Sequence, residues 1–291
     1  PVLAALAGLF LPAVIYLALN AGGPGAAGWG IPVATDVAFA VGVLALPGRR
    51  VPAGLKVLLL TIAVADDIGA VIISIAIAYS AGIEPRWLAA SIGASLLVAA
   101  LWRISSSPWL HVPLGVATWA FMLVSGVHAT IAGVILGLLT PGSLTDDLQQ
   151  RLHPLSSYLV LPLFALGNAG VPLDLASLRA AVTSPVSIGI IAGLLLGKTL
   201  GIGMTGAVVA RTRLGRLPLG VAPRHVLAVA PLGGIGFTVA LFIAGLTFDV
   251  GPNLDAAKVG VLAGSLLSAV LGTILLLSVA GRGSRPASSP R

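Results

Sequence analysis

Two adjacent carboxylates, Asp66 and Asp67, lie in the middle of an apolar run that reaches from Leu55 to about Tyr79. A run of this length is long enough to cross a bilayer, which takes about 20 residues. An aspartate at the centre of such a helix costs roughly 2.5–3.5 kcal/mol on insertion scales, so an adjacent pair is expensive to place there. Carboxylate oxygens bind protons and also small hard cations such as Na+ or Li+, by the logic that governs Ca2+ and Mg2+. The pair therefore predicts a site where protons and a cation compete.

The two carboxylates point about 100° apart on a helix, so one can face a positively charged partner while the other faces a cavity. We predict that the partner is Lys198, which lies at mid-depth in another apolar segment. Four glycines recur at four-residue spacing around it and would let a second helix approach closely, bringing Lys198 within reach of the aspartates; they are Gly189, Gly193, Gly197 and Gly201. An ion pair that only holds helices together would leave the second aspartate unexplained. For Lys198 itself, structural pairing and proton transfer both remain open.

Asp36 and Thr35 follow a proline and precede a short apolar run. Asp36 is expected to cap a half-helix that starts near Val37, to line the ion path, or to do both. Thr35 is expected either to offer an oxygen to a cation or to cap the same helix. A second interruption contains three glycines, which we expect to supply backbone conformations that other residues cannot adopt; they are Gly233, Gly234 and Gly236.

His128 is the remaining polar candidate in the apolar segments. A hydrogen-bonded core or interface group is favoured there over a pH sensor.

The composition indicates a polytopic membrane protein. Of the 291 residues, 57% are hydrophobic and 9% are charged, and the mean hydropathy is +1.08, whereas a soluble domain has about 25% charged residues. The net charge of +7 comes from basic residues in short loops, which are topology signals rather than a nucleic-acid surface. The absence of cysteine excludes disulfides and thiolate metal sites.

The fold class we expect is an all-α membrane protein with about ten transmembrane segments. These are approximately 1–20, 32–48, 55–79, 87–102, 109–123, 125–141, 154–172, 184–210, 224–248 and 256–280. With ten spans, the Lys and Arg residues of the loops fall on one side except Arg86, Arg179 and Lys258. The positive-inside rule then places both ends of the chain in the cytoplasm.

Two segments are expected to be broken, the second at residues 31–36 and the ninth at residues 230–238. Each is the middle member of a trio, and the second trio starts on the opposite side of the membrane from the first. This predicts inverted repeats over about 1–79 and 184–280 within a single transmembrane domain, 1–280, followed by a disordered polar tail, 281–291. Transporters use paired discontinuous helices of this kind, with the ion site at the midplane. Because the chain begins without Met inside an apolar stretch, we expect it to be part of a longer protein.

Six motifs then carry a resemblance to a known family. They are 28–40 (GWGIPVATDVAFA), 66–70 (DDIGA), 125–133 (SGVHATIAG), 161–170 (LPLFALGNAG), 197–198 (GK) and 233–238 (GGIGFT). In this order they closely resemble NhaA-type sodium/proton antiporters, and the match covers nearly the whole chain up to about residue 280. Inverted repeats are already described for this family, so the repeats and the resemblance are not independent arguments.

The resemblance implies a twelve-helix inverted-repeat fold in the bacterial inner membrane, with two crossing discontinuous helices. It implies electrogenic export of Na+ or Li+ in exchange for protons, rising in activity at alkaline pH. Asp67 matches the main cation-binding carboxylate, Asp66 the one that pairs with the lysine, here Lys198, and Thr35 and Asp36 the residues at the first broken helix. By the same resemblance we expect this chain to begin after the family's first two helices, between which lies a β-hairpin used in dimer contacts.

The resemblance further implies that the full-length protein is a homodimer in membrane lipid, without nucleic acid and without a cofactor beyond the transported ions. Two other functions remain as alternatives. A sodium-coupled symporter on the same fold would need a polar pocket for an organic substrate, and the interior offers little beyond Thr130, Asn168 and Thr238. An intramembrane aspartyl protease, the one enzyme considered, would need two converging carboxylates, and adjacent residues on one helix diverge.

Overall fold

The computed structural model describes residues 2–48, 52–70, 83–105, 107–127, 129–168, 170, 175–212 and 221–280. The side chains of some residues in these ranges, Asp67 and Thr130 among them, lie outside this description. His128, the second half of the predicted segment 55–79 and the predicted tail 281–291 also lie outside it. All regular elements among the described residues are helical, in agreement with the expected class.

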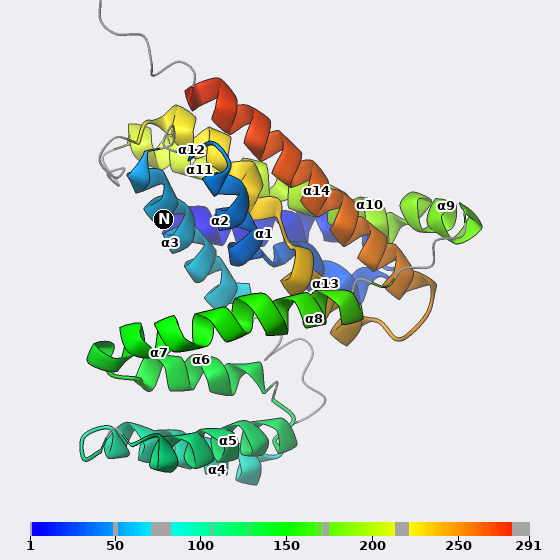
Figure 1. The fold of residues 1–291 in the computed structure, drawn as a ribbon. Coiled ribbons are helices and arrows are strands. Elements are labelled where there is room, and N and C mark those ends of the chain that lie inside the picture. The colour runs from blue at the N-terminus through cyan, green and yellow to red at the C-terminus, as the bar shows by residue number, and fades with distance from the viewer. Residues whose placement is uncertain are drawn as a thin grey trace, which may run out of the picture. The chain divides into compact units, whose positions relative to one another are not determined.

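The chain divides into two compact units, Pro1–Ala70 with Leu166–Arg291, and Val71–Ala165. The first unit holds the elements labelled in Figure 1 as α1 (Val2–Asn20), α2 (Val37–Ala45), α3 (Ala53–Ala70), α9 (Leu175–Thr183), α10 (Pro185–Ala192), α11 (Lys198–Arg211), α12 (Pro223–Val229), α13 (Phe237–Thr247) and α14 (Pro252–Ala280). Three short helical segments join them: η1 (Ala26–Val33), η5 (Gly193–Gly197) and η6 (Ala230–Gly234). The prediction of one domain over 1–280 stays a prediction.

The core of the first unit is shared by the two regions predicted as repeats. Leu59 and Ile62 of α3 pack in one buried cluster with Ile202 of α11, Val229 of α12 and Leu232 of η6. These side chains are apolar and almost fully enclosed, so their burial holds together elements that lie more than a hundred residues apart in the sequence. The predicted site residues lie on elements that this core fixes in place.

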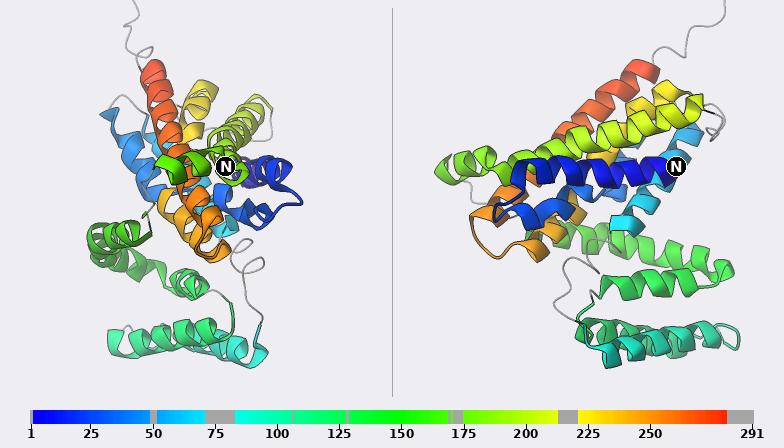
Figure 2. Two further views of the ribbon diagram at one scale, coloured as in Figure 1. Left: turned by 90° about the vertical axis from the view of Figure 1, so that its right-hand side faces the viewer. Right: turned by 180° about the vertical axis from the view of Figure 1, so that it is seen from behind.

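The glycine ladder of the predicted eighth segment packs against α1. A Cβ on Gly197 would lie 2.7 Å from the Cα of Pro12, and one on Gly201 would lie 2.5 Å from the carbonyl oxygen of Ala7. Figure 2 shows α1 running alongside α10 and α11. The expected close approach is therefore present, but the neighbour is α1 and not the aspartate helix α3. Because glycine has no side chain, the two backbones can touch here.

Helix α14 makes a similar approach to the other face of the same region. A Cβ on Gly260 would lie 2.9 Å from the Cα of Ser187 in α10, and one on Gly264 would lie 3.0 Å from Leu194 in η5. The α10–η5–α11 segment is therefore held between α1 and α14, and Lys198 at the start of α11 is fully buried.

Among the described residues, four helical stretches are long and apolar enough to span a membrane: Leu3–Asn20, Ala26–Ala45, Pro185–Val209 and Pro252–Val279. A fifth is reached if Pro223–Gly234 and Phe237–Thr247, bent by 41°, count as one span. The predicted third segment is described only to Ala70. The apolar stretches agree with a membrane protein that crosses the bilayer several times, and the number of ten stays a prediction.

The second unit contains α4 (Pro85–Leu101), α5 (Pro108–Val124), α6 (Thr130–Leu139), α7 (Gly142–Leu155) and η4 (Ser156–Val160), and α8 (Leu161–Asn168) begins at its end. Residues 142–153 were expected to be a loop before a segment starting at 154, but α7 is already helical there. An ion pair between Asp147 and Arg151, 3.1 Å apart at i,i+4 spacing, favours that helix.

Candidate ion-binding site

The two interrupted helices meet at their breaks. Ala34 and Asp36 have extended backbone between η1 and α2, and Ile235 has extended backbone between η6 and α13. The backbone N–H of Asp36 donates a hydrogen bond to the carbonyl oxygen of Ile235. Extended residues expose N–H and C=O groups that a helix would use internally. Each break therefore satisfies part of the backbone of the other.

Asp36 caps both half-helices. Its Oδ1 accepts a hydrogen bond of 3.1 Å from the N–H of Phe39 in α2, and its Oδ2 accepts one of 3.1 Å from the N–H of Thr238 in α13. The hydroxyl of Thr238 also donates to Oδ2. The side chain is buried, and helix N-termini carry partial positive charge that favours a carboxylate. The predicted capping role is present, and the role in the ion path stays a prediction.

Asp66 forms the predicted ion pair with Lys198. The Nζ of Lys198 donates to Oδ2 of Asp66, and the two side chains are 0% and 1% exposed. The other carboxylate oxygen, Oδ1, is buried and has no hydrogen-bond partner among the described residues. An ion pair without water requires additional hydrogen bonds to offset the cost of desolvation. Asp66 thus has one oxygen committed to the pair and one that remains available.

The hydroxyl of Thr35 joins this pair to the second broken helix. It lies within hydrogen-bonding distance of two acceptors, Oδ2 of Asp66 and the carbonyl oxygen of Gly233, the latter at 2.7 Å. A hydroxyl has one hydrogen to donate, so the two acceptors share it. Thr35 consequently connects the first break to α3 and to η6 at one point.

The three glycines of the second break are required for space rather than for backbone conformation. Positive φ values occur at other described glycines and not at Gly233, Gly234 or Gly236, so the expectation of special backbone conformations is wrong. A Cβ on Gly234 would lie 2.2 Å from the carbonyl oxygen of Leu194, and one on Gly233 would lie 2.4 Å from Ile202. Such separations do not occur between real atoms, so the backbone of Leu194 occupies the place of a side chain at Gly234 and the end of the Ile202 side chain occupies it at Gly233.

The structure brings Thr35, Asp36, Asp66, Lys198 and Gly233 together through these bonds. Asp67 lies in the helical backbone of α3, and its side chain is outside the described part of the chain, so its predicted role as the main cation ligand stays a prediction. The same holds for the role of His128.

Sequence reasoning missed the contribution of Thr238, which it weighed only as a polar group for an organic substrate. The signal was its place at the second position of a helix that follows a break, where the backbone N–H needs an acceptor.

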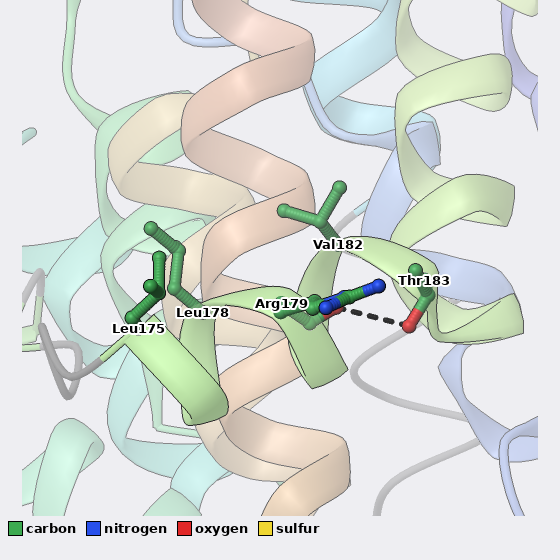
Figure 3. A pocket seen from close by; sticks show the side chains of 5 residues that line it. All are labelled: Leu175, Leu178, Arg179, Val182 and Thr183. Carbon is green, nitrogen blue, oxygen red and sulfur yellow. Dashed lines mark hydrogen bonds between the residues drawn. The ribbon is translucent and has the colours of Figure 1, made fainter.

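A surface pocket among the described residues lies elsewhere, on α9. It is lined by Leu175, Leu178, Arg179, Val182 and Thr183, all from α9 (Figure 3). The Thr183 hydroxyl in it is already bonded to the carbonyl oxygen of Arg179, at 2.9 Å. A single helix face with one cation does not supply oxygen ligands for Na+, so this pocket is no candidate for the ion site.

Comparison with known proteins identifies the family. The family model described as Na+/H+ antiporter 1 matches residues 1–276. The Na(+)/H(+) antiporter NhaA of Sodalis glossinidius is 46% identical over 302 residues, covering 98% of this chain and 75% of the relative. NhaA 1 of Clostridium beijerinckii is 40% identical, with 94% and 71% covered, and NhaA of Cronobacter sakazakii is 46% identical, with 96% and 73% covered. The chain therefore belongs to the Na+/H+ antiporter 1 family, whose members are transporters and not enzymes.

Proposed function

We propose that this chain exchanges cytoplasmic Na+ or Li+ for external H+ across the bacterial inner membrane, with Asp66 and Asp67 as the carboxylates that bind cation and proton. Sodium/proton exchange is the activity of its family. The observation that carries the assignment to this site is the state of Asp66: fully buried, paired through Oδ2 with Lys198, and without a partner at Oδ1 among the described residues.

The exchange follows from competition for the same oxygens. Lys198 offsets the negative charge of Asp66, and Thr35 donates a hydrogen bond to the same carboxylate oxygen, Oδ2. The carboxylate of Asp66 can therefore stay ionised inside the protein between transport events. Asp67 is the next residue along α3, and successive positions on a helix are about 100° apart. Two carboxylates this close influence each other's proton binding. A proton on either removes a charge that would hold the cation, and a cation displaces protons. If the site can switch from one side of the membrane to the other only while it holds a cation or a proton, each ion crosses only in exchange for the other.

The transport is electrogenic and increases at alkaline pH, and the ions are its only ligands, without a cofactor or nucleic acid. The full-length protein is a homodimer in membrane lipid. The chain crosses the membrane ten times as inverted repeats, 1–79 and 184–280, with both ends cytoplasmic. The loop charges and the meeting of the two breaks support this arrangement.

The test is exchange in everted membrane vesicles carrying the full-length protein. Addition of Na+ to the outside should release protons from the acidified lumen, with no organic solute present. Asp67→Asn should abolish this response while the protein stays inserted, and Asp255→Asn, in the first turn of α14, should retain it. A sodium response that persists in Asp67→Asn would refute the assignment. A requirement for an organic solute would favour the symporter instead.

A further inference from the structure

The second half-helix, α13, has no cap of its own. Its N-cap residue is Gly236, which has no side chain to accept a hydrogen bond. The first half-helix, α2, differs because Asp36 is its own N-cap and bonds to the N–H of Phe39. Helices leave their first backbone N–H groups without internal partners, and these groups are costly when they are buried and unbonded. The acceptors for α13 must therefore come from elsewhere.

Ser265, in the middle of α14, supplies two of these acceptor contacts. Its Oγ accepts hydrogen bonds from the N–H of Gly236 at 3.2 Å and from the N–H of Phe237 at 3.1 Å. The next N–H along the chain, that of Thr238, donates to Asp36. Three consecutive N–H groups are thus bound by two side chains from other elements. Ser265 is 5% exposed, so water does not readily replace its hydroxyl.

We propose that Ser265 is a positioning residue for the ion site, acting through Thr238 on Asp36. The inference rests on the proposed exchange at Asp66 and Asp67. Ser265 fixes the first residues of α13, and that placement aims both donors of Thr238 at Oδ2 of Asp36. Asp36 in turn holds the N-terminus of α2, immediately after Thr35, which contacts Asp66. Helix α14 therefore controls the geometry at the aspartates without contributing a ligand.

The same helix contains a matched control. Ser268 lies three residues further on and is fully buried like Ser265, but its Oγ has no hydrogen-bond partner among the described residues. Ser265→Ala and Ser268→Ala therefore remove the same atom from buried positions of the same helix, and only the first deprives backbone N–H groups of their acceptor. Ser265→Thr keeps the hydroxyl and serves as the rescue variant.

The experiment measures the sodium dependence of exchange in vesicles with the full-length protein, together with its melting temperature. Ser265→Ala should raise the apparent KM for Na+ about five- to tenfold, since a misplaced half-helix weakens the site. Ser268→Ala and Ser265→Thr should stay within about twofold of the unaltered protein. Should Ser265→Ala fail to insert, Ser265→Cys, whose sulfur is a weak acceptor, replaces it with the same expectation.

A second measurement tests the route through Thr238. In a Thr238→Val background, where the hydroxyl bond to Asp36 is lost and the N–H bond remains, Ser265→Ala should raise the apparent KM by a smaller factor than in the unaltered protein, because residues that act through one contact are not additive. Full additivity would overturn the inference. So would equal KM values for Ser265→Ala and Ser268→Ala, or a lower melting temperature with an unchanged KM. Absence of exchange in the unaltered protein would instead refute the proposed function, and this inference with it.

Discussion

The carboxylate of Asp36 is bonded to both the backbone N–H and the hydroxyl of Thr238, a residue 202 positions further along the chain. The same carboxylate caps its own helix at Phe39. One buried negative charge therefore serves the positive ends of two half-helices. A change at this carboxylate should affect both broken helices together, which sets it apart from an ordinary helix cap.

Asp36→Asn should destabilise the protein by about 1–3 kcal/mol, since the amide can present only one acceptor oxygen to donors that approach both carboxylate oxygens. One half-helix then faces an NH2 group instead of an acceptor. Thermal melting in detergent checks this, with Asp255→Asn as the control because Asp255 lies in the first turn of a helix away from the breaks. Equal melting temperatures for the two variants would contradict the double-cap role.

Lys198→Ala should cost about 3–5 kcal/mol of stability, because it leaves the buried charge of Asp66 without its partner. Lys258→Ala is the control, since Lys258 bonds to the carbonyl oxygen of Gly170 at an exposed position and should lose much less. The double variant Asp66→Asn/Lys198→Ala should melt above Lys198→Ala, because it removes the unpaired charge. A double variant that melts lower than Lys198→Ala would argue against the pair.

Thr35→Val should reduce exchange and Thr35→Ser should largely preserve it, because only the serine keeps a hydroxyl between Asp66 and Gly233. A loss of about fivefold in kcat/KM corresponds to one buried hydrogen bond of about 1 kcal/mol. Thr273→Val is the matched control, since among the described residues that hydroxyl bonds only to the carbonyl oxygen of its own helix four residues before it. The measurement is sodium-driven proton release in vesicles. Similar kinetics for Thr35→Val and Thr35→Ser would show that the Thr35 hydroxyl has no part in exchange.

Gly234→Ala should abolish exchange or prevent insertion, because its Cβ would lie 2.2 Å from the carbonyl oxygen of Leu194. Gly245→Ala, in α13 and with nothing within 4 Å of its Cβ, should be neutral or slightly stabilising, since alanine favours helix over glycine. Expression level and melting temperature distinguish the two. Unchanged expression and melting temperature in Gly234→Ala would show that the backbone at Leu194 can move away from an added Cβ.

That Lys198 pairs with one of the two aspartates could be predicted because charge inside an apolar chain is scarce and must be matched, and the resemblance to the family indicated Asp66. The cap at Asp36 could be predicted from its place after a break. Its second partner could not, since capping rules are local and Thr238 lies in the other predicted repeat. The role of the glycines in the second break could not be predicted, because the sequence does not show which atoms lie next to them. They were therefore expected to adopt unusual backbone angles, whereas the structure shows that they leave space for close neighbours.

The ladder of glycines against α1 has a consequence for movement. At Gly197 in η5 and Gly201 in α11 the backbone lies so close to that of α1 that no side chain fits between them, so sliding of α1 along this segment would drive larger residues into that space. We therefore expect α1 and this segment to move together. For an antiporter we therefore expect movement at the extended residues of the two breaks, where the backbone N–H of Asp36 donates to the carbonyl oxygen of Ile235.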